Sequence, residues 1–285
     1  MPHHINGTLF QYSANVAFCA DGARGRIHGC KHLVLVGGLT DGLLNPKYSI
    51  LLAESLAKED WCLVQPLLSS SYQGFGVSSL DKDAEELHLL IESLNTEFAS
   101  KGIVLMGHST GCQDAVRFVD KFSNQEHPLL LGIVLQAPVS DREWLATKES
   151  TPALIRDAKA MVEAGKGEEI LFRDHEGGNG APVCARRFLS LADRGGDDDM
   201  FSSDYSDGEL KERLGHCHFL ASLVLVSGSD EYMPAHVQHH SLAIRLSRAL
   251  GPKSVPVVIE NGVHDLAGSE DALLHHVLCF LQRIA

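Results

Sequence analysis

The chain has 285 residues, of which 44% are hydrophobic, and it carries a formal net charge of −13. A chain of this length and composition can bury one large core, and we expect a single α/β domain with one insertion. The excess of acidic groups repels polyanions, so nucleic acid and anionic membrane surfaces are excluded as expected partners.

Seven cysteines are scattered along the chain without C-x-x-C spacing, and several lie inside apolar runs. Their odd number and their positions indicate free thiols in a reducing compartment. The N-terminal residues show no basic segment followed by an apolar one, and no run approaches the ~18 apolar residues that cross a bilayer. We therefore expect a soluble intracellular protein of the cytoplasm, and the sequence carries no indication of its oligomeric state.

Strands and helices are predicted to alternate along the first 138 residues. Two apolar patches within residues 8–20 predict a hairpin at a sheet edge. Continuous apolar runs are typical of strands buried on both faces, and their alternation with helical stripes indicates right-handed βαβ units and a mostly parallel sheet with helices on both faces. The predicted strands are 33–36, 61–64, 103–106 and 129–135, and the predicted helices begin at Asn45-Pro46 and span 84–98 and 115–122.

The alternation stops between about residues 138 and 217. Thr151-Pro152 begins a predicted helix, but the rest of this segment passes through glycine-rich and acidic stretches with no strand signal. Such a segment is most simply an insertion over the sheet edge, so we assign residues 1–138 and 218–285 to an α/β core and residues 139–217 to a helical cap. The regular pattern resumes with strands 220–226 and 255–259, a helix that ends at Gly251-Pro252 and a last helix from Ser269.

The stretch Gly107-His108-Ser109-Thr110-Gly111 joins a predicted strand to a predicted helix. This G-x-S-x-G pattern holds the serine on a sharp, strained turn with its hydroxyl exposed, and a side chain at either glycine would collide with its neighbours. The pattern arises by chance on the order of 0.2 times in a chain of this length, but here its strand–turn–helix context is present. We predict that Ser109 is a nucleophile.

A serine nucleophile needs a histidine to take its proton and a carboxylate to orient that histidine. In hydrolases with this elbow the three residues follow the order serine, acid, histidine, each at the carboxyl end of a strand. Asp230 and Glu231 follow one predicted strand, and His264 follows the last one. Adjacent side chains on an extended turn point opposite ways, so only one of the two carboxylates reaches His264, and the residues themselves leave the choice open.

Acyl transfer also needs N–H donors for the developing oxyanion. The amide of Thr110 is one expected donor, and the glycine-rich turn Gly37-Gly38-Leu39-Thr40 supplies the second, with Leu39 as the donor and Gly38 beside it. The alternative for this turn is an ordinary tight connection between strand and helix.

Several clusters resemble metal sites by composition. Histidines are paired at 216 and 218, 239 and 240, and 275 and 276, and three aspartates stand together at 197–199. Adjacent side chains diverge on helices and strands, and the aspartates lack the alternating ligands of a calcium loop. We therefore expect no metal and no cofactor.

Four segments together resemble one α/β-hydrolase family: the elbow Gly107–Asp114, the turn Gly37–Gly42, the loop Ser71–Gly76 and the turn Ser229–Pro234. Most members of this family are uncharacterised, and it includes fungal esterases that open the ester bonds of hydroxamate siderophores such as fusarinine. The resemblance spans about residues 30–140 and 218–285. It implies an α/β-hydrolase fold and a triad of Ser109, Asp230 and His264, with the aspartate preferred because Pro234 stands four residues beyond it.

The leading hypothesis is a cofactor-independent carboxylic-ester hydrolase that acts on a small molecule through an acyl-enzyme on Ser109, with thioesters and lactones left open. The alternative is a ligand receptor that keeps this pocket with slow or no turnover. In the cap, Trp144 and Leu154 are candidates for covering an acyl group, and Arg186 and Arg187 for binding a carboxylate or hydroxamate oxygen. The bland alternative is that these cap residues pack on the core or are solvated.

Overall fold

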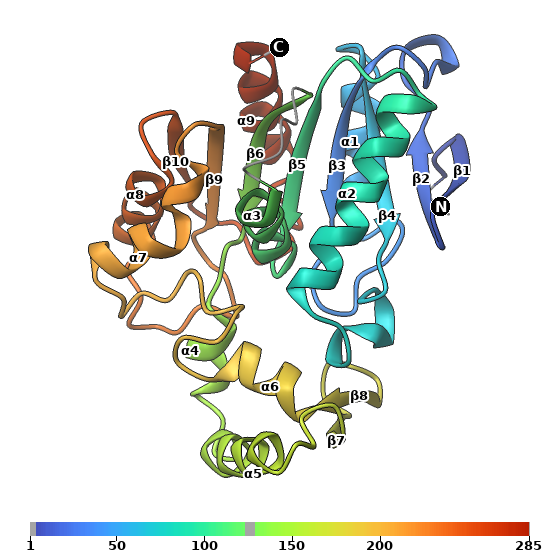
Figure 1. The fold of residues 1–285 in the computed structure, drawn as a ribbon. Helices are drawn as coiled ribbons and strands as arrows, with labels where there is room; N and C mark the ends of the chain where they lie inside the picture. Colours follow the sequence, from blue (N-terminus) through green and yellow to red (C-terminus); the bar gives the residue numbers. More distant parts are fainter. Residues whose placement is uncertain (1–3, 123–128, 285) are drawn as a thin grey trace.

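The computed structural model describes residues 4–122 and 129–284, and its centre is an eight-stranded sheet in the order β1-β2-β4-β3-β5-β6-β9-β10 (Figure 1). The strands from β4 to β10 are parallel, whereas β1 and β2 form the predicted antiparallel hairpin at one edge. The mostly parallel sheet predicted from the sequence is therefore confirmed. The first three residues of the N-terminal stretch lie outside the described part. The strands are β1 Gly7–Tyr12, β2 Asn15–Ala20, β3 Lys31–Val36, β4 Trp61–Leu67, β5 Ile103–His108, β6 Leu130–Gln136, β9 Ala221–Ser227 and β10 Ser254–Ile259.

Helices cover both faces of this sheet (Figure 1). One layer of buried apolar side chains lies between the sheet and α2, α3 and α8, and a second layer lies between the sheet and α1 and α9. Every residue of the central strand β5 is buried, as expected for a strand covered on both faces. The helices are α1 Ser49–Leu56, α2 Leu80–Thr96, α3 Gly111–Phe122, α8 His239–Leu250 and α9 Glu270–Ile284, with short 3₁₀ turns η1 Ala23–Gly25, η2 Tyr72–Gly76 and η3 Gly215–Cys217.

Two local expectations differ from the structure. The helix expected to begin at Asn45-Pro46 begins at Ser49 instead, because residues 45 and 46 belong to the preceding turn, where the Asn45 carbonyl accepts a hydrogen bond from Gln65 Nε2 at 2.8 Å. The segment expected to lack strands contains a small antiparallel pair, β7 Ile170–Asp174 and β8 Ala181–Cys184. Its strands are short, and β7 has no fully buried residue, so the apolar run that marks a buried strand is missing.

The inserted segment packs around a second, smaller apolar cluster, formed by the β7–β8 pair and the helices α5 Thr151–Glu163 and α6 Ala185–Ala192 together with Phe75 of η2. A short helix, α4 Asp141–Leu145, leads into it from the sheet. Residues 200–217, which the sequence placed in the cap, pack differently: Phe201, Leu210 and Leu214 are buried in the main core layer, and α7 Asp207–Leu214 lies against α8. Packing thus divides the chain near the end of α6 rather than at residue 217. No helix in the described residues is long and apolar enough to span a membrane.

Candidate active site

Ser109 occupies the turn between β5 and α3 with a φ of +54°, a left-handed backbone angle that costs energy for any residue but glycine. A Cβ at Gly107 would lie 2.2 Å from the Gly111 carbonyl oxygen, and a Cβ at Gly111 would lie 2.3 Å from the Val36 carbonyl oxygen. Both flanking glycines are therefore required by close backbone contacts. The sharp, strained turn predicted from the G-x-S-x-G pattern is present, and Ser109 is partly exposed.

His264 and Asp230 meet at the ends of β10 and β9. Nδ1 of His264 lies 2.8 Å from Oδ2 and 3.0 Å from Oδ1 of Asp230, whose carboxylate is fully buried. Glu231 also contacts the same loop, but its Oε2 accepts the backbone N–H of His264 at 3.0 Å rather than a ring proton. Of the two carboxylates left open by the sequence, Asp230 faces the imidazole and Glu231 faces the backbone.

Gln136, at the carboxyl end of β6, connects the serine turn to the histidine loop. Its carbonyl oxygen accepts the N–H of Ser109 at 3.0 Å, and its side-chain Nε2 donates to the carbonyl oxygen of His264 at 3.0 Å. Its Oε1 accepts the Tyr48 hydroxyl at 3.0 Å and Nδ1–H of His108 at 2.5 Å. Gln136 is completely buried, so each of these bonds is shielded from water.

His108 precedes the serine, and its ring centroid lies 5.0 Å from that of His264. Burial, with a further contribution from the charge of His264, lowers the pKa of His108 to about 3. His108 therefore stays neutral at neutral pH and adds no positive charge beside His264. The pairing with Gln136 fixes its proton on Nδ1.

The predicted oxyanion donors lie beside Ser109. The N–H of Gly38 already donates to Oδ2 of Asp41 at 2.8 Å, whereas the N–H groups of Leu39 and Thr110 have no protein acceptor in the described part of the chain. A Cβ at Gly38 would lie 2.8 Å from Cβ of Ser109, so glycine is needed there for space rather than as a donor. Two unpaired amides thus remain next to the serine.

Comparison with known proteins places this chain in a family. The family model described as "Protein of unknown function (DUF1749)" matches residues 1–282. The chain belongs to the DUF1749 family. One relative is UPF0613 protein PB24D3.06c from Schizosaccharomyces pombe. It is 35% identical to this chain, and the match covers 82% of this chain and 80% of the relative.

Two relatives from Aspergillus fumigatus carry functional names. Fusarinine C esterase sidJ is 32% identical and is matched over 88% of this chain and 89% of its own length. The solved structure of siderophore hydrolase EstB superposes with a TM-score of 0.80 at 28% identity, covering 99% of this chain and 98% of that one. The DUF1749 protein therefore has the α/β-hydrolase fold, and its relatives include named esterases.

A polar cavity of about 30 Å³ adjoins the Leu39 and Thr110 amides of the DUF1749 protein, and its lining includes Asp83, Asp114 and Arg187. Burial raises the pKa of Asp83 to about 6 and raises that of Asp114 well above its usual range. Oδ1 of Asp114 is buried without a protein partner among the described residues, and the cavity has room for about two water molecules.

The two cap arginines have different surroundings from those expected for substrate ligands. Arg187 is only 4% exposed, forms an ion pair with Asp198 and donates to the carbonyl oxygen of Phe75 at 3.0 Å. It acts as the counter-ion of buried carboxylates and joins the cap to η2. Arg186 is exposed and pairs with Glu168 at 2.6 Å on the outer surface.

An aromatic pair covers the histidine. The Tyr232 ring lies with its centroid 4.6 Å from that of His264, and the Trp144 ring of α4 lies 5.4 Å from Tyr232. Trp144 thus contacts the ring that lies on His264, whereas Leu154 is partly buried against the apolar cluster around α5, α6 and Phe75. Tyr232 and Gln136 escaped prediction, although both follow or end core strands at the carboxyl edge, where functional side chains gather.

Asp141, the first residue of α4, titrates close to this site. Burial raises the pKa of Asp141 to about 7, and the nearby negative charge of Asp198 raises it in the same direction. This holds although Gln113 Nε2 donates a hydrogen bond to Oδ2 of Asp141 at 2.9 Å. The pKa is higher in the folded chain than the ~3.9 of an unfolded aspartate, so the folded state holds the proton more tightly. The contribution of Asp141 to folding stability is therefore greatest below its pKa in the unfolded chain. It is lost as the pH rises through its pKa in the folded chain.

We expect Asp141→Asn to reduce the loss of stability between about pH 5 and about pH 8 by on the order of 2 kcal/mol, because the amide has no charge to bury. Urea unfolding at the two pH values measures this. Asp197→Asn, at an exposed position, serves as the control and should leave the pH dependence unchanged. Equal losses in the wild type and in Asp141→Asn would contradict the assignment.

Proposed function

We propose that this DUF1749 protein hydrolyses a carboxylic ester through an acyl-enzyme on Ser109. The observation that carries the proposal is the contact between His264 Nδ1 and Asp230 at 2.8 Å, on a loop that Gln136 connects to the strained serine turn. The unpaired amides of Leu39 and Thr110 beside that serine support acyl chemistry. The esterase names of the relatives agree with it.

In the proposed reaction, Nε2 of His264 takes the hydroxyl proton while Oγ of Ser109 attacks the ester carbonyl. Asp230 holds the proton on Nδ1 and stabilises the imidazolium, and the Leu39 and Thr110 N–H groups bind the oxyanion. Collapse expels the alcohol, which receives the proton from His264. A water molecule, deprotonated by His264, then attacks the acyl-enzyme and releases the carboxylic acid, and the proton returns to Ser109.

For the substrate class, the match to a relative named fusarinine C esterase, over 88% of this chain and 89% of that relative, makes an ester-linked hydroxamate siderophore the first compound to test. The structural match to a siderophore hydrolase over nearly the whole of both chains supports the same choice. Cap residues near the histidine, such as Trp144, would choose among esters, since function depends on the site rather than on the fold. Incubation with fusarinine C, followed by mass spectrometry of the hydroxy-acid products, tests this choice separately from aryl-ester turnover.

Ser109→Ala should abolish labelling by a fluorophosphonate and turnover of aryl esters, since the variant lacks the attacking oxygen. Labelling is read by intact-protein mass spectrometry, and thermal unfolding verifies that the variant is folded. Labelling that persists in Ser109→Ala, or a wild type that binds esters with only slow single turnover, would contradict the proposal; the second outcome would favour a ligand receptor.

The two neighbouring carboxylates provide a matched pair. Asp230→Asn should lower kcat by about 10⁴-fold, because an asparagine favours the wrong imidazole tautomer. Glu231→Gln should reduce kcat far less, since its oxygen accepts only the backbone N–H of His264 and an amide oxygen can do the same. Steady-state kinetics on one aryl ester decides the order, and the reverse ranking would assign the acid to Glu231.

Trp144→Ala should change the ranking of short against bulky acyl esters, because its ring packs on the tyrosine that covers His264. Fluorophosphonate labelling of Ser109 should stay nearly intact. Parallel loss of labelling and of turnover on every ester would instead make Trp144 part of the scaffold that holds the catalytic residues.

A further inference from the structure

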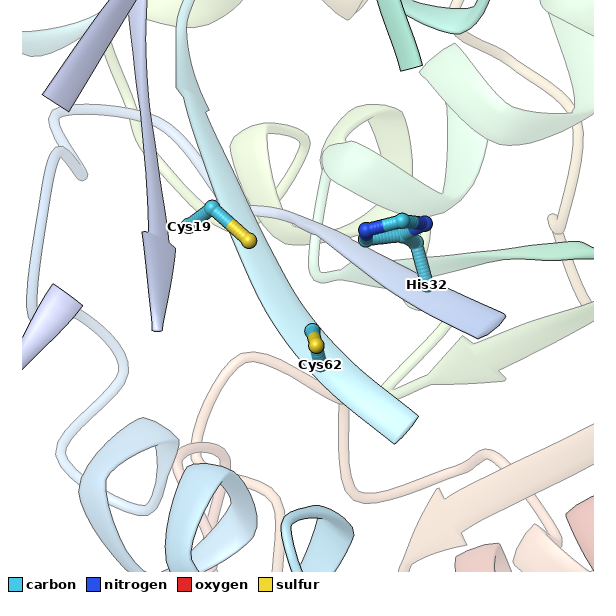
Figure 2. A group of neighbouring side chains, drawn as sticks. All are labelled: Cys19, His32 and Cys62. Atoms are coloured by element: carbon cyan, nitrogen blue, oxygen red, sulfur yellow. The ribbon is translucent and has the colours of Figure 1, made fainter. Parts of the chain in front are cut away.

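Three buried side chains converge on the sheet at a distance from the candidate active site: Cys19 of β2, His32 of β3 and Cys62 of β4 (Figure 2). One ligand atom from each, two thiol sulfurs and a ring nitrogen, lies within 4.8 Å of the other two. In residues 4–122 and 129–284, this is the only group of three or more histidine, cysteine or acidic side chains gathered in this way.

Strand register brings these residues together. His32 and Cys62 are direct partners across the parallel pair β3–β4, and Cys19 is the partner of Val64, two residues beyond Cys62. Residues two apart in a strand point to the same face, so Cys19 and Cys62 project from one face of the sheet. That face carries the core layer under α2 and α3.

A fourth side chain stands at the edge of the group. Cys30 precedes His32 by two residues, and its Sγ lies 2.8 Å from Sγ of Cys62 and 3.7 Å from Nε2 of His32. Cys30 is only 2% exposed. The group therefore offers three thiols and one imidazole, enclosed by protein.

Nδ1 of His32, the ring nitrogen that faces away from the thiols, has a hydrogen-bond partner of the kind found beside metal-ligating histidines. Nδ1 lies 2.8 Å from Oγ of Ser100, whose hydroxyl donates to the carbonyl oxygen of Gly102 at 3.2 Å. With the proton on Nδ1, Nε2 presents its lone pair toward the thiols, which is the arrangement that orients ligating histidines. The other tautomer would place a proton on Nε2, toward the carbonyl oxygen of Ile27 at 3.2 Å.

We propose that Cys19, Cys30, Cys62 and His32 bind one Zn²⁺ ion in a tetrahedral site. Thiolate and imidazole are the ligands that Zn²⁺ favours, at about 2.3 Å for sulfur and about 2.0 Å for nitrogen, and four protein ligands make a closed, structural site. Ligands at these lengths lie about 3.5–3.8 Å apart. Binding would therefore draw the ligand atoms of Cys19, His32 and Cys62, now within 4.8 Å of one another, together and would move Sγ of Cys30 away from its 2.8 Å contact with Sγ of Cys62. Binding releases a proton from each thiol that ligates the ion.

The position of this site in the sheet separates it from catalysis. His32 and Cys62 lie near the amino ends of β3 and β4, whereas Ser109 follows the carboxyl end of β5. Zinc here would join the antiparallel strand β2 to the parallel core, and so it would stabilise the edge of the sheet. The inference is independent of the proposed esterase activity.

The test is the zinc content of the purified full-length chain after dialysis against a weak chelator, measured by inductively coupled plasma mass spectrometry. We expect about one Zn²⁺ per chain in the wild type, and at least a fivefold lower content in Cys62→Ser and His32→Asn. Cys217→Ser, which removes a buried thiol elsewhere in the core, is the matched control and should retain zinc. All these variants keep the exposed histidines, so weak surface binding cannot produce the difference.

Two further measurements keep the test decisive if a variant folds poorly. Co²⁺ exchanged into the wild type should give the intense visible bands of a tetrahedral thiolate site, and a strong chelator should lower the thermal midpoint of the wild type. Aryl-ester turnover well below that midpoint should persist after chelation. A folded wild type without zinc, zinc retained in Cys62→Ser, or a mass lower by two hydrogens from a bond between Cys30 and Cys62 would each overturn the proposal.

Discussion

The geometry of the candidate site depends on one buried amide, that of Gln136. The backbone carbonyl oxygen of Gln136 accepts the N–H of Ser109, and its side-chain Nε2 donates to the carbonyl oxygen of His264. Two loops separated by more than half of the sequence are thus fixed to one residue. Each hydrogen bond adds only about 1 kcal/mol, but a buried partner left unpaired costs about 1–3 kcal/mol. The network with Tyr48 and His108 therefore specifies the position of the site more than it stabilises the fold.

Much of this architecture could be predicted because its signals are local. The apolar run of β5, the glycines around Ser109 and the order of Asp230 and His264 each lie within a few residues of a strand end. No local signal of this kind could decide between Asp230 and Glu231. Both follow the same strand, and only the direction of each side chain in the folded turn separates the ring contact from the backbone contact.

The parts that escaped prediction depend on contacts between distant segments. The thiol and imidazole group draws on three strands, and its members show no spacing that a metal-site pattern would match. The sequence made Arg187 a candidate substrate ligand or a solvated cap residue, whereas the folded chain surrounds it with carboxylates from α2, α3 and the segment after α6. The strands β7 and β8 are only five and four residues long, and β7 has no buried residue, so the pair leaves only a weak periodic signal in the sequence.

The burial of Arg187 has a mechanical consequence. Its pairing with Asp198 and its bond to Phe75, together with the packing of β8 on η2, attach the cap to the core through charges that water does not reach. Swinging the cap outward would break this pairing and the bond to Phe75 together and would expose the apolar side chains packed around Phe75, so we expect the cap to stay in place. Ser109 is partly exposed with the cap in place. A ligand would then reach Ser109 past a fixed wall of the cap rather than by displacing it.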